Sequence, residues 1–212
     1  TCVDLERFNF VTGKGRYEKH KYSQNGKSVL IYTGSLGTWY MLSEMIDFYR
    51  ELLNSGFDGL FLILSQTDKG WIEKNIPDDL RKYVIIDFSD PRRVVDFLNS
   101  ADIAIFFIKP CLSKAASCPT KFGEYLACGL PVIINGGIGD TEEIVRRERV
   151  GVVINDFNIR EYKRSIIELK ELLKEGDVLQ KRCRSAAEKY FSLKDGSEKY
   201  ALIYTRLAQK MN

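Results

Sequence analysis

Six short, strongly apolar runs divide the sequence, and stretches with apolar residues at helical spacing separate them. The runs lie at 28–33, 60–64, 83–86, 103–108, 131–134 and 150–154. The run at 103–108 is apolar on both faces, which is typical of a parallel strand covered on both sides. This alternation predicts an α/β, Rossmann-like fold with a doubly wound, six-stranded parallel sheet, whose ligands bind at the carboxyl ends of the strands. Apolar spacing predicts a helix from about Trp39 to Asn54 after the first strand, and helices near 158–174, 177–190 and 196–210 should complete the chain.

The composition favours one globular domain. The chain has 212 residues with 44% hydrophobic content, which is enough for one sizeable core. Lys and Arg number 32 against 29 Asp and Glu, a balance too even for a nucleic-acid-binding surface. The apolar runs are far shorter than the ~20 residues that a membrane span needs. We therefore expect no nucleic-acid partner and no transmembrane segment.

The cysteines do not suggest a disulfide framework or a metal site. There are five, an odd number, and they are widely scattered: Cys2, Cys111, Cys118, Cys128 and Cys183. No two form a C-x-x-C pair, and the sequence has one histidine, His20, to assist metal binding. We expect reduced thiols in a cytoplasmic protein, with no metal and no cofactor.

The segment 117–133 reads as a short helix with a marked start and end. Pro119 suits a first turn, where its missing N–H has no helical partner, and Gly129 suits the left-handed position after the last turn. Phe122 shares one packing face with its apolar neighbours, while Lys121 and Glu124 lie together on another. The helix should lead directly into the strand at 131–134.

The first turn of this helix is a candidate anion site. Unpaired backbone N–H groups and the helix dipole favour a phosphate there, and Thr120 and Lys121 would add a hydroxyl and a charge. Glu124, one turn further on, could accept hydrogen bonds from a ribose diol. The alternative is an ordinary crossover helix with a solvated Lys–Glu pair.

The same segment resembles the nucleotide-sugar motif of glycosyltransferase family 4 (group 1) and its GT-B relatives. That motif runs carboxylate, seven residues, Glu, then Ala-x-Gly-x-Pro-Val, and Glu124 and 127–132 match its second half. Ala116 stands where the first carboxylate, associated with the donor sugar, is expected. A subset of the family has Ser-Pro-x-Lys-x-x-Glu-Tyr-x-Ala, which the stretch from Ser117 approximates with Cys118 inserted.

The resemblance extends to the beginning of the sequence. Residues 1–10 are similar to the Gly-Val-Asp-x-x-x-Phe segment that follows the interdomain linker in these enzymes. It implies that 1–27 is a linker and surface segment after a missing N-terminal domain, and that 28–212 is the nucleotide-sugar-binding half of a GT-B fold. A chain without its other half should expose apolar surface between Tyr200 and Leu207.

Two glycine loops add candidate donor contacts through the resemblance. Gly34 and Ser35 follow the first strand, and Gly137 lies in the loop 135–139. The second loop leads into a helix that Asp140 should open, with Glu143 completing a capping box. Acidic side chains at that helix start would repel a diphosphate, so we expect the diphosphate at 119–121 instead.

Further contacts are expected after the second and third strands. The resemblance implies that the backbone at Asp87 and Phe88 meets the nucleobase, although core packing of Phe88 is the alternative. Family members also carry an Arg and a Lys that grip the diphosphate. No Arg follows the first strand here, and Lys69 is a loose candidate for the Lys, with a solvated loop lysine as the alternative.

The resemblance implies a glycosyltransferase of the hexosyltransferase type. It also implies that transfer from a nucleoside-diphosphate sugar to a saccharide or lipid acceptor is retaining and metal-independent. The Asp-x-Asp metal motif of other glycosyltransferases is absent, so no metal site is predicted. The missing domain would hold the acceptor and make any peripheral membrane contact, so this chain alone should bind donor without turnover. No catalytic residue is assigned. The alternatives are a GT-B sugar-nucleotide epimerase and a non-catalytic nucleotide-binding module.

Overall fold

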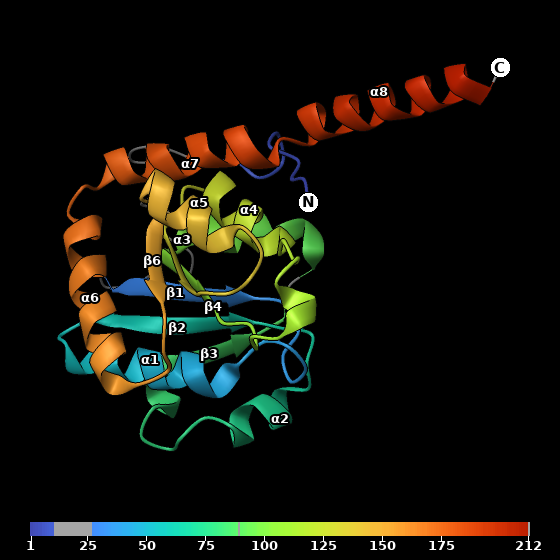
Figure 1. Cartoon of the computed structure of the whole chain (residues 1–212). Coiled ribbons are helices and arrows are strands. Elements are labelled where there is room, and N and C mark those ends of the chain that lie inside the picture. Colours follow the sequence, from blue (N-terminus) through green and yellow to red (C-terminus); the bar gives the residue numbers. More distant parts are fainter. Residues whose placement is uncertain (11–26, 89, 212) are drawn as a thin grey trace.

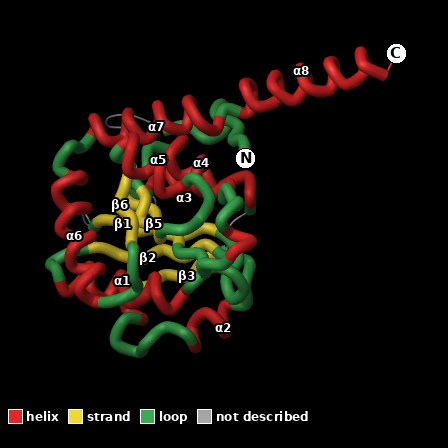
Figure 2. Tube along the Cα trace, in the orientation of Figure 1, coloured by secondary structure: helices red, strands yellow, loops and turns green. Residues whose placement is uncertain are grey.

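The computed structural model describes residues 1–10, 27–88 and 90–211, and within them it has one six-stranded sheet. The strands are β1 (Ser28–Thr33), β2 (Gly59–Leu64), β3 (Val84–Asp87), β4 (Ile103–Phe106), β5 (Val132–Asn135) and β6 (Gly151–Ile154). They are parallel and lie in the order β3-β2-β1-β4-β5-β6. Figure 2 shows the strands gathered in the middle of the domain, with helices around them. The predicted Rossmann-like sheet is confirmed. Its strand order reverses direction between β1 and β4, the place where ligands bind in doubly wound folds.

Helices cover both faces of the sheet (Figure 1). They are α1 (Leu42–Asn54), α2 (Lys69–Lys74), α3 (Val94–Ser100), α4 (Thr120–Ala127), α5 (Thr141–Glu148), α6 (Ile159–Leu173), α7 (Asp177–Phe191) and α8 (Leu193–Met211). Short 3-10 turns occupy Arg81–Tyr83, Pro91–Arg93 and Leu112–Lys114. Helix α7 packs across α4 and α5, whereas α6 packs against α1. Because both faces are covered, the central strands are buried almost completely.

The connection from β1 to α1 differs from the prediction. Apolar spacing predicted a helix from about Trp39, but α1 begins at Leu42. The residues before it pair with the chain after β4 instead: Tyr40 forms an antiparallel bridge with Ile108, and the N–H of Lys109 donates to the Trp39 carbonyl over 2.8 Å. This long-range pairing takes backbone groups that the expected first helical turn would have used.

The capping box predicted at the start of α5 is wrong. Asp140 is the N-cap residue, but its backbone angles of φ −93° and ψ 5° are not extended, and its side chain makes no capping hydrogen bond. Glu143 pairs with Arg147 one turn along the helix instead. The acidic charge at this helix start nevertheless remains, because Glu142 and Glu143 lie in the first turn.

The N-terminal segment is fixed to the domain. Val3 and Phe8 are buried, and the N–H of Val3 donates to the Phe191 carbonyl over 2.7 Å. The rest of the predicted 1–27 segment, residues 11–26, lies outside the described residues. Residues 1–10 therefore contact the domain through the buried side chains of Val3 and Phe8.

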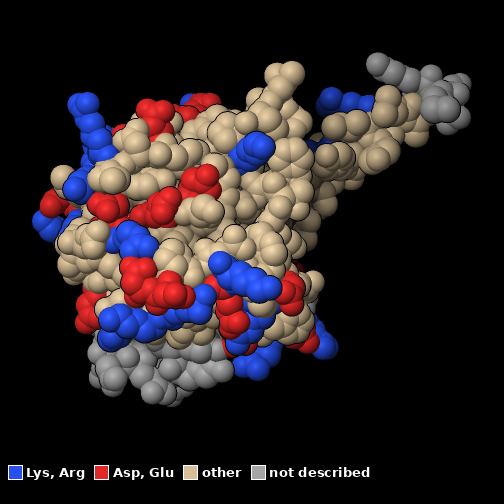
Figure 3. Space-filling view, turned by 90° about the horizontal axis from the view of Figure 1, so that it is seen from below, with Lys and Arg blue, Asp and Glu red and all other residues tan. Residues whose placement is uncertain are grey.

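Helix α8 extends away from the body of the domain (Figure 1). Its large apolar side chains are exposed, among them Tyr200 at 64% and Tyr204 at 68%, so the predicted apolar surface is confirmed. Elsewhere, basic and acidic side chains are mixed over the face seen in Figure 3, while the coloured part of α8 shows mostly uncharged residues in this view. In the described part of the chain, no helix combines the length and apolar character that a bilayer span requires.

Candidate functional site

Two adjoining cavities lie at the carboxyl ends of β1 and β2, and Thr33, Gly34 and Val94 line both. The first has a volume of about 300 Å³ and is completed by Ser35, Leu64, Ser65 and Gln66. The second has about 410 Å³ and is completed by Arg7, Phe8, Tyr40, Thr120, Lys121 and Glu124. We call the two together the crevice. It lies at the reversal of strand order, where the fold predicts a ligand.

Hollows of similar or larger size occur elsewhere on the domain. One of about 570 Å³ lies beside Gly59 at the opposite, amino end of β2, and one of about 350 Å³ lies between α5, β6 and α6. Neither contains a residue that the sequence singled out. Position in the fold, rather than volume, therefore identifies the crevice as the candidate site.

The glycine loop after β1 approaches α4 closely. Gly34 has φ +122°, a conformation that side chains disfavour, and a Cβ there would lie 2.8 Å from the Nζ atom of Lys121. The Gly34 N–H donates to the Leu64 carbonyl over 2.9 Å, which holds the loop across the ends of β1 and β2. Both the backbone angle and the neighbouring lysine thus require glycine at this position.

Helix α4 begins as predicted. Pro119 is its N-cap residue, and Gly129 follows its end with φ +72°. Thr120 is exposed at the crevice, whereas Gly123 is sealed beneath Val3 and Phe191, whose side-chain atoms would lie 2.7 and 2.9 Å from an added Cβ. The first turn therefore presents the Thr120–Lys121 side to a ligand.

Lys121 does not lie on a solvated face, so that alternative is wrong. Lys121 is only 8% exposed, and its Nζ atom donates a 3.0 Å hydrogen bond to the hydroxyl oxygen of Tyr32. Nζ also lies 4.1 Å from the ring centre of Tyr32 and 3.4 Å from that of Tyr40. Burial lowers the pKa of Lys121 well below its usual value, against the raising effect of Glu124.

Glu124 is partly buried at the wall of the crevice. Burial raises the pKa of its carboxyl group, while Lys121 and then Arg7 lower it. Among the described residues no ion pair joins Lys121 to Glu124 or to another carboxylate within 4.0 Å. The carboxylate oxygens of Glu124 therefore remain available to a ligand with hydroxyl donors.

Tyr125 fixes α4 to the end of β1. Its hydroxyl oxygen accepts from the Thr33 N–H over 2.8 Å and lies 3.0 Å from the Thr33 Oγ1 atom, in a fully buried position. The phenol thus satisfies the last backbone N–H of β1, which has no further strand partner. This contact sets the distance between the glycine loop and the first turn of α4.

The structure brings half of the predicted site residues into the crevice: Gly34, Ser35, Thr120, Lys121 and Glu124. Of the others, Pro119 caps α4 without lining either cavity, and Phe88 is exposed at 64%. The Asp87 carbonyl accepts from the N–H of Ser65, a lining residue. Asp87 therefore adjoins the crevice through its backbone.

The second glycine loop packs on the loop before α4. A Cβ at Gly139 would lie 2.0 Å from the Ser117 carbonyl oxygen, whereas one at Gly137 would meet no atom within 4 Å. Ser117 and Gly137 line neither cavity. Lys69 lines a different hollow and pairs with Glu73, so it does not reach the crevice.

The sequence did not identify the other lining residues of the crevice as site residues, among them Arg7 and Tyr40. Tyr40 was assigned to a helix, and Arg7 lies in a segment that was taken as a linker. Within residues 1–10, 27–88 and 90–211, no three His, Cys, Asp or Glu side chains are grouped so that they could hold a metal ion. None of the five cysteines forms a disulfide among the described residues.

Solved glycosyltransferase structures share the fold. A glycosyltransferase from Rickettsia africae has a TM-score of 0.76 at 15% identity over 98% of this chain and 56% of its own. TarM from S. aureus, solved in complex with UDP and two further ligands, has 0.64 at 16% identity over 92% and 38%. The C-terminal domain of a group 1 family protein from Francisella tularensis has 0.62 at 15% identity over 90% and 99%.

At these identities the likeness shows a shared fold. The chain spans about half the length of the first two relatives found, 56% and 52%. No curated protein sequence matches it. The sequence model of the family described as "Glycosyl transferases group 1" matches residues 27–171. This is well over half of the sequence, and it includes the strands beside the crevice and α4. The chain therefore belongs to the group 1 glycosyltransferases.

Proposed function

We propose that this chain binds the nucleoside-diphosphate sugar donor of a glycosyltransferase in the crevice. The observation that carries the proposal is the meeting of Gly34, Thr120 and Glu124 at one cavity, although they come from separate elements. Family membership supports a transferase, and TarM was solved with UDP. Positioning the donor and neutralising its diphosphate would be the contribution of this half to catalysis.

The site residues divide between the parts of the donor. The diphosphate would lie between the Gly34–Ser35 loop and the Thr120–Lys121 turn, where loop amides and the helix dipole favour an anion. Glu124 would accept hydrogen bonds from the ribose. Ser117, Pro119 and Gly137 stay candidates for the sugar side, and Asp87 and Phe88 for the nucleobase.

The larger enzyme is also part of the proposal. Transfer would be retaining, metal-independent and of the hexosyl type, with a saccharide or lipid acceptor held by a further domain that makes any peripheral membrane contact. Two observations support a further domain. This chain covers 56% of the length of the Rickettsia africae glycosyltransferase, and the apolar side chains of α8 are exposed. This chain alone would bind without turnover, and its cytoplasmic location stays a prediction.

Calorimetry with UDP, GDP, ADP and their sugar conjugates tests the proposal, preceded by a thermal-shift screen. One nucleotide series should bind. The Glu124→Gln substitution should reduce the binding free energy of that series by about 1.5–3 kcal/mol, because a charge-assisted hydrogen bond is lost. Glu168→Gln, on the outer surface of α6, is the matched control. A crystal soaked with donor that shows the ligand outside the crevice, or no binding by any nucleotide, would overturn the proposal.

Ala116 favours a second candidate, a non-catalytic nucleotide-binding module. It is exposed in the loop before α4, where the family resemblance expects a carboxylate for the donor sugar. Such a module would bind the nucleoside diphosphate and its sugar conjugate equally, because nothing would recognise the sugar. A sugar conjugate that binds at least tenfold more tightly than the free diphosphate would exclude it.

A further inference from the structure

The crevice has an unexpected shortage of accessible positive charge for a diphosphate. The loop after β1 contains no arginine, and Lys69 pairs with Glu73 at another hollow. Lys121 is buried with its Nζ atom against Tyr32 and Tyr40. Burial lowers the pKa of Lys121 and so disfavours its charged form. A diphosphate therefore needs another side chain in the crevice that already carries a positive charge in the unliganded protein.

Arg7 is placed to provide this charge. It is exposed, and it lines the same 410 Å³ cavity as Thr120, Lys121 and Glu124. Its guanidinium carbon lies 5.1 Å from the ring centre of Phe8, which is buried in the wall. Burial raises the pKa of Glu124, and the charges of Lys121 and then Arg7 lower it. Arg7 therefore interacts electrostatically with a residue that lines the same cavity.

The segment that carries Arg7 is held in place by hydrogen bonds to its backbone. The Asp4 carboxylate accepts from the N–H groups of Glu6 and Arg7 over 3.0 and 3.1 Å, which closes a turn. Arg184 of α7 donates to the Leu5 carbonyl over 3.0 Å and to the Phe8 carbonyl over 2.6 Å. The turn and the arginine thus fix the chain on both sides of Arg7.

Arg184 also ties this segment to the helix that forms the opposite wall. Its Nη1 atom donates to the Ala127 carbonyl at the end of α4 over 3.2 Å. One guanidinium therefore bonds the N-terminal segment and α4 at the same time. The position of Arg7 relative to Lys121 and Glu124 is set before a ligand binds, which lowers the cost of ordering the site.

We propose that Arg7 is a donor-binding residue whose guanidinium contacts the diphosphate of the nucleotide. A guanidinium is permanently charged and offers parallel N–H donors that match two phosphate oxygens. It would take the place of the arginine that the loop after β1 lacks. The proposal rests on the proposed function, because it assumes that the crevice binds a nucleoside diphosphate.

Calorimetry on four proteins tests the role of Arg7: the unaltered chain, Arg7→Ala, Arg7→Lys and the control Arg92→Ala. The Arg92→Ala substitution also removes one exposed positive charge. Unlike Arg7, however, Arg92 does not line the crevice, and its side chain is 87% exposed beside Asp90. The ligands are UDP, GDP and ADP, each compared with its nucleoside. The melting temperatures of the free proteins show whether each variant is folded.

Arg7→Ala should weaken nucleoside-diphosphate binding about ten- to hundredfold, with Arg7→Lys between it and the unaltered chain. Arg92→Ala should bind normally, and nucleoside binding should be the same in all four proteins. Equal weakening of diphosphate and nucleoside by Arg7→Ala would show a structural role, and equal affinities of Arg7→Ala and Arg92→Ala would show no role; either overturns the inference. Failure of the unaltered chain to bind any of the diphosphates would instead overturn the proposed function.

Discussion

The Nζ atom of Lys121 donates a hydrogen bond to the hydroxyl oxygen of Tyr32 over 3.0 Å, and that hydroxyl donates in turn to the Ser35 carbonyl over 2.7 Å. The buried amine is thus linked to the glycine loop rather than to a carboxylate. The ring of Tyr40, centred 3.4 Å from Nζ, covers its other side. A charge in this position is stabilised by ring faces and one oxygen, which replace only part of its lost hydration.

Lys121 should make stability depend on pH. Because burial lowers its pKa well below 10.5, the unfolded chain binds a proton that the folded chain lacks in the range between the two pKa values. The free energy of unfolding should therefore rise as pH increases through this window, by up to about 1.4 kcal/mol per pH unit. Lys121→Met, of similar volume, should lack this rise and be the more stable protein at about pH 7.

Urea denaturation of both proteins between about pH 6.5 and 9.5 tests this prediction. The upper limit keeps the tyrosines near the amine protonated, since burial raises the pKa values of Tyr32, Tyr40 and Tyr125 above 10.0. Glu124 also acts on the amine, because its charge raises the pKa of Lys121 against the larger effect of burial. A stability difference between the two proteins that does not change with pH would contradict the prediction.

Gly34→Ala should destabilise the domain by about 1–3 kcal/mol from backbone strain alone. The new methyl group would also displace the Lys121 Nζ atom, which lies 2.8 Å from the Cβ position. Gly56→Ala isolates the strain, because Gly56 has φ +89° and an added Cβ there would meet nothing within 4 Å. In thermal unfolding Gly34→Ala should cost more than Gly56→Ala, and Lys121→Ala in the same chain should reduce the excess. Equal costs for the two glycines would show that Lys121 is not held against the loop.

The sheet could be predicted because its information is local. Each strand is a short apolar run bounded by polar residues or glycine, and all six appear in the expected order. The start of α1 could not be predicted, since it depends on pairing between Tyr40 and Ile108, which are distant in the sequence. Local periodicity does not contain that contact.

The site was predicted in part for the same reason. Gly34, Thr120 and Glu124 belong to segments whose motifs are readable, and the fold brings them to one cavity. The burial of Lys121 was not predictable, because the space for its amine exists only where Gly34 crosses it. Arg7 was not identified because the position of residues 5–8 at the crevice depends on Arg184 of α7. Arg184 donates to the Phe8 carbonyl across 176 residues of sequence.

Asn135→Ala should cost about 2–4 kcal/mol, because it leaves two buried backbone groups without partners. The Asn135 Oδ1 atom accepts from the Ile108 N–H over 2.8 Å, and Nδ2 donates to the Ile108 carbonyl over 2.9 Å. Ile108 in turn pairs with Tyr40, so nucleotide affinity should fall together with stability. Asn54→Ala, an exposed asparagine that bonds Glu51, should change stability by less than about 0.5 kcal/mol in the same urea titration. A similarly small change for Asn135→Ala would mean that the Ile108 backbone finds other partners.

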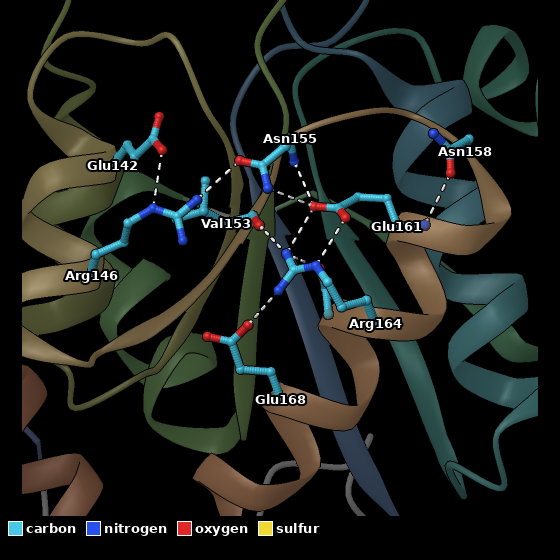
Figure 4. A network of polar contacts seen from close by, with 9 residues as sticks. Glu142, Arg146, Val153, Asn155, Asn158, Glu161, Arg164 and Glu168 are labelled. Atoms are coloured by element: carbon cyan, nitrogen blue, oxygen red, sulfur yellow. Dashed lines mark hydrogen bonds and ion pairs between the residues drawn. The ribbon is translucent and has the colours of Figure 1, made fainter.

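Glu161 should contribute stability that is lost in acid. Figure 4 shows its carboxylate between Arg164 and Asn155, at the junction of β6 and α6. Arg164 donates to its two oxygens over 2.8 and 2.9 Å, and the Asn155 N–H and Nδ2 atoms each donate over 2.9 Å. The bonds from Arg164, with those from Asn155, lower the pKa of Glu161 to about 2 despite partial burial.

The pH dependence of this network follows from the sign of that shift. The folded-state pKa lies below the ordinary value of 4.5, so the stabilisation is complete above about pH 4.5 and is lost as pH falls towards 2. Glu161→Gln should therefore be less stable than the unaltered chain by about 1–2 kcal/mol at neutral pH. The gap should narrow as pH falls below about 4.5 and close only below about pH 2, where the folded-state carboxylate is also protonated. Glu168→Gln, which removes one bond from Arg164 at a side chain 49% exposed, should show a smaller gap. Because the network lies away from the crevice, both variants should bind nucleotide normally; an undiminished gap at low pH would assign the effect to packing instead of charge.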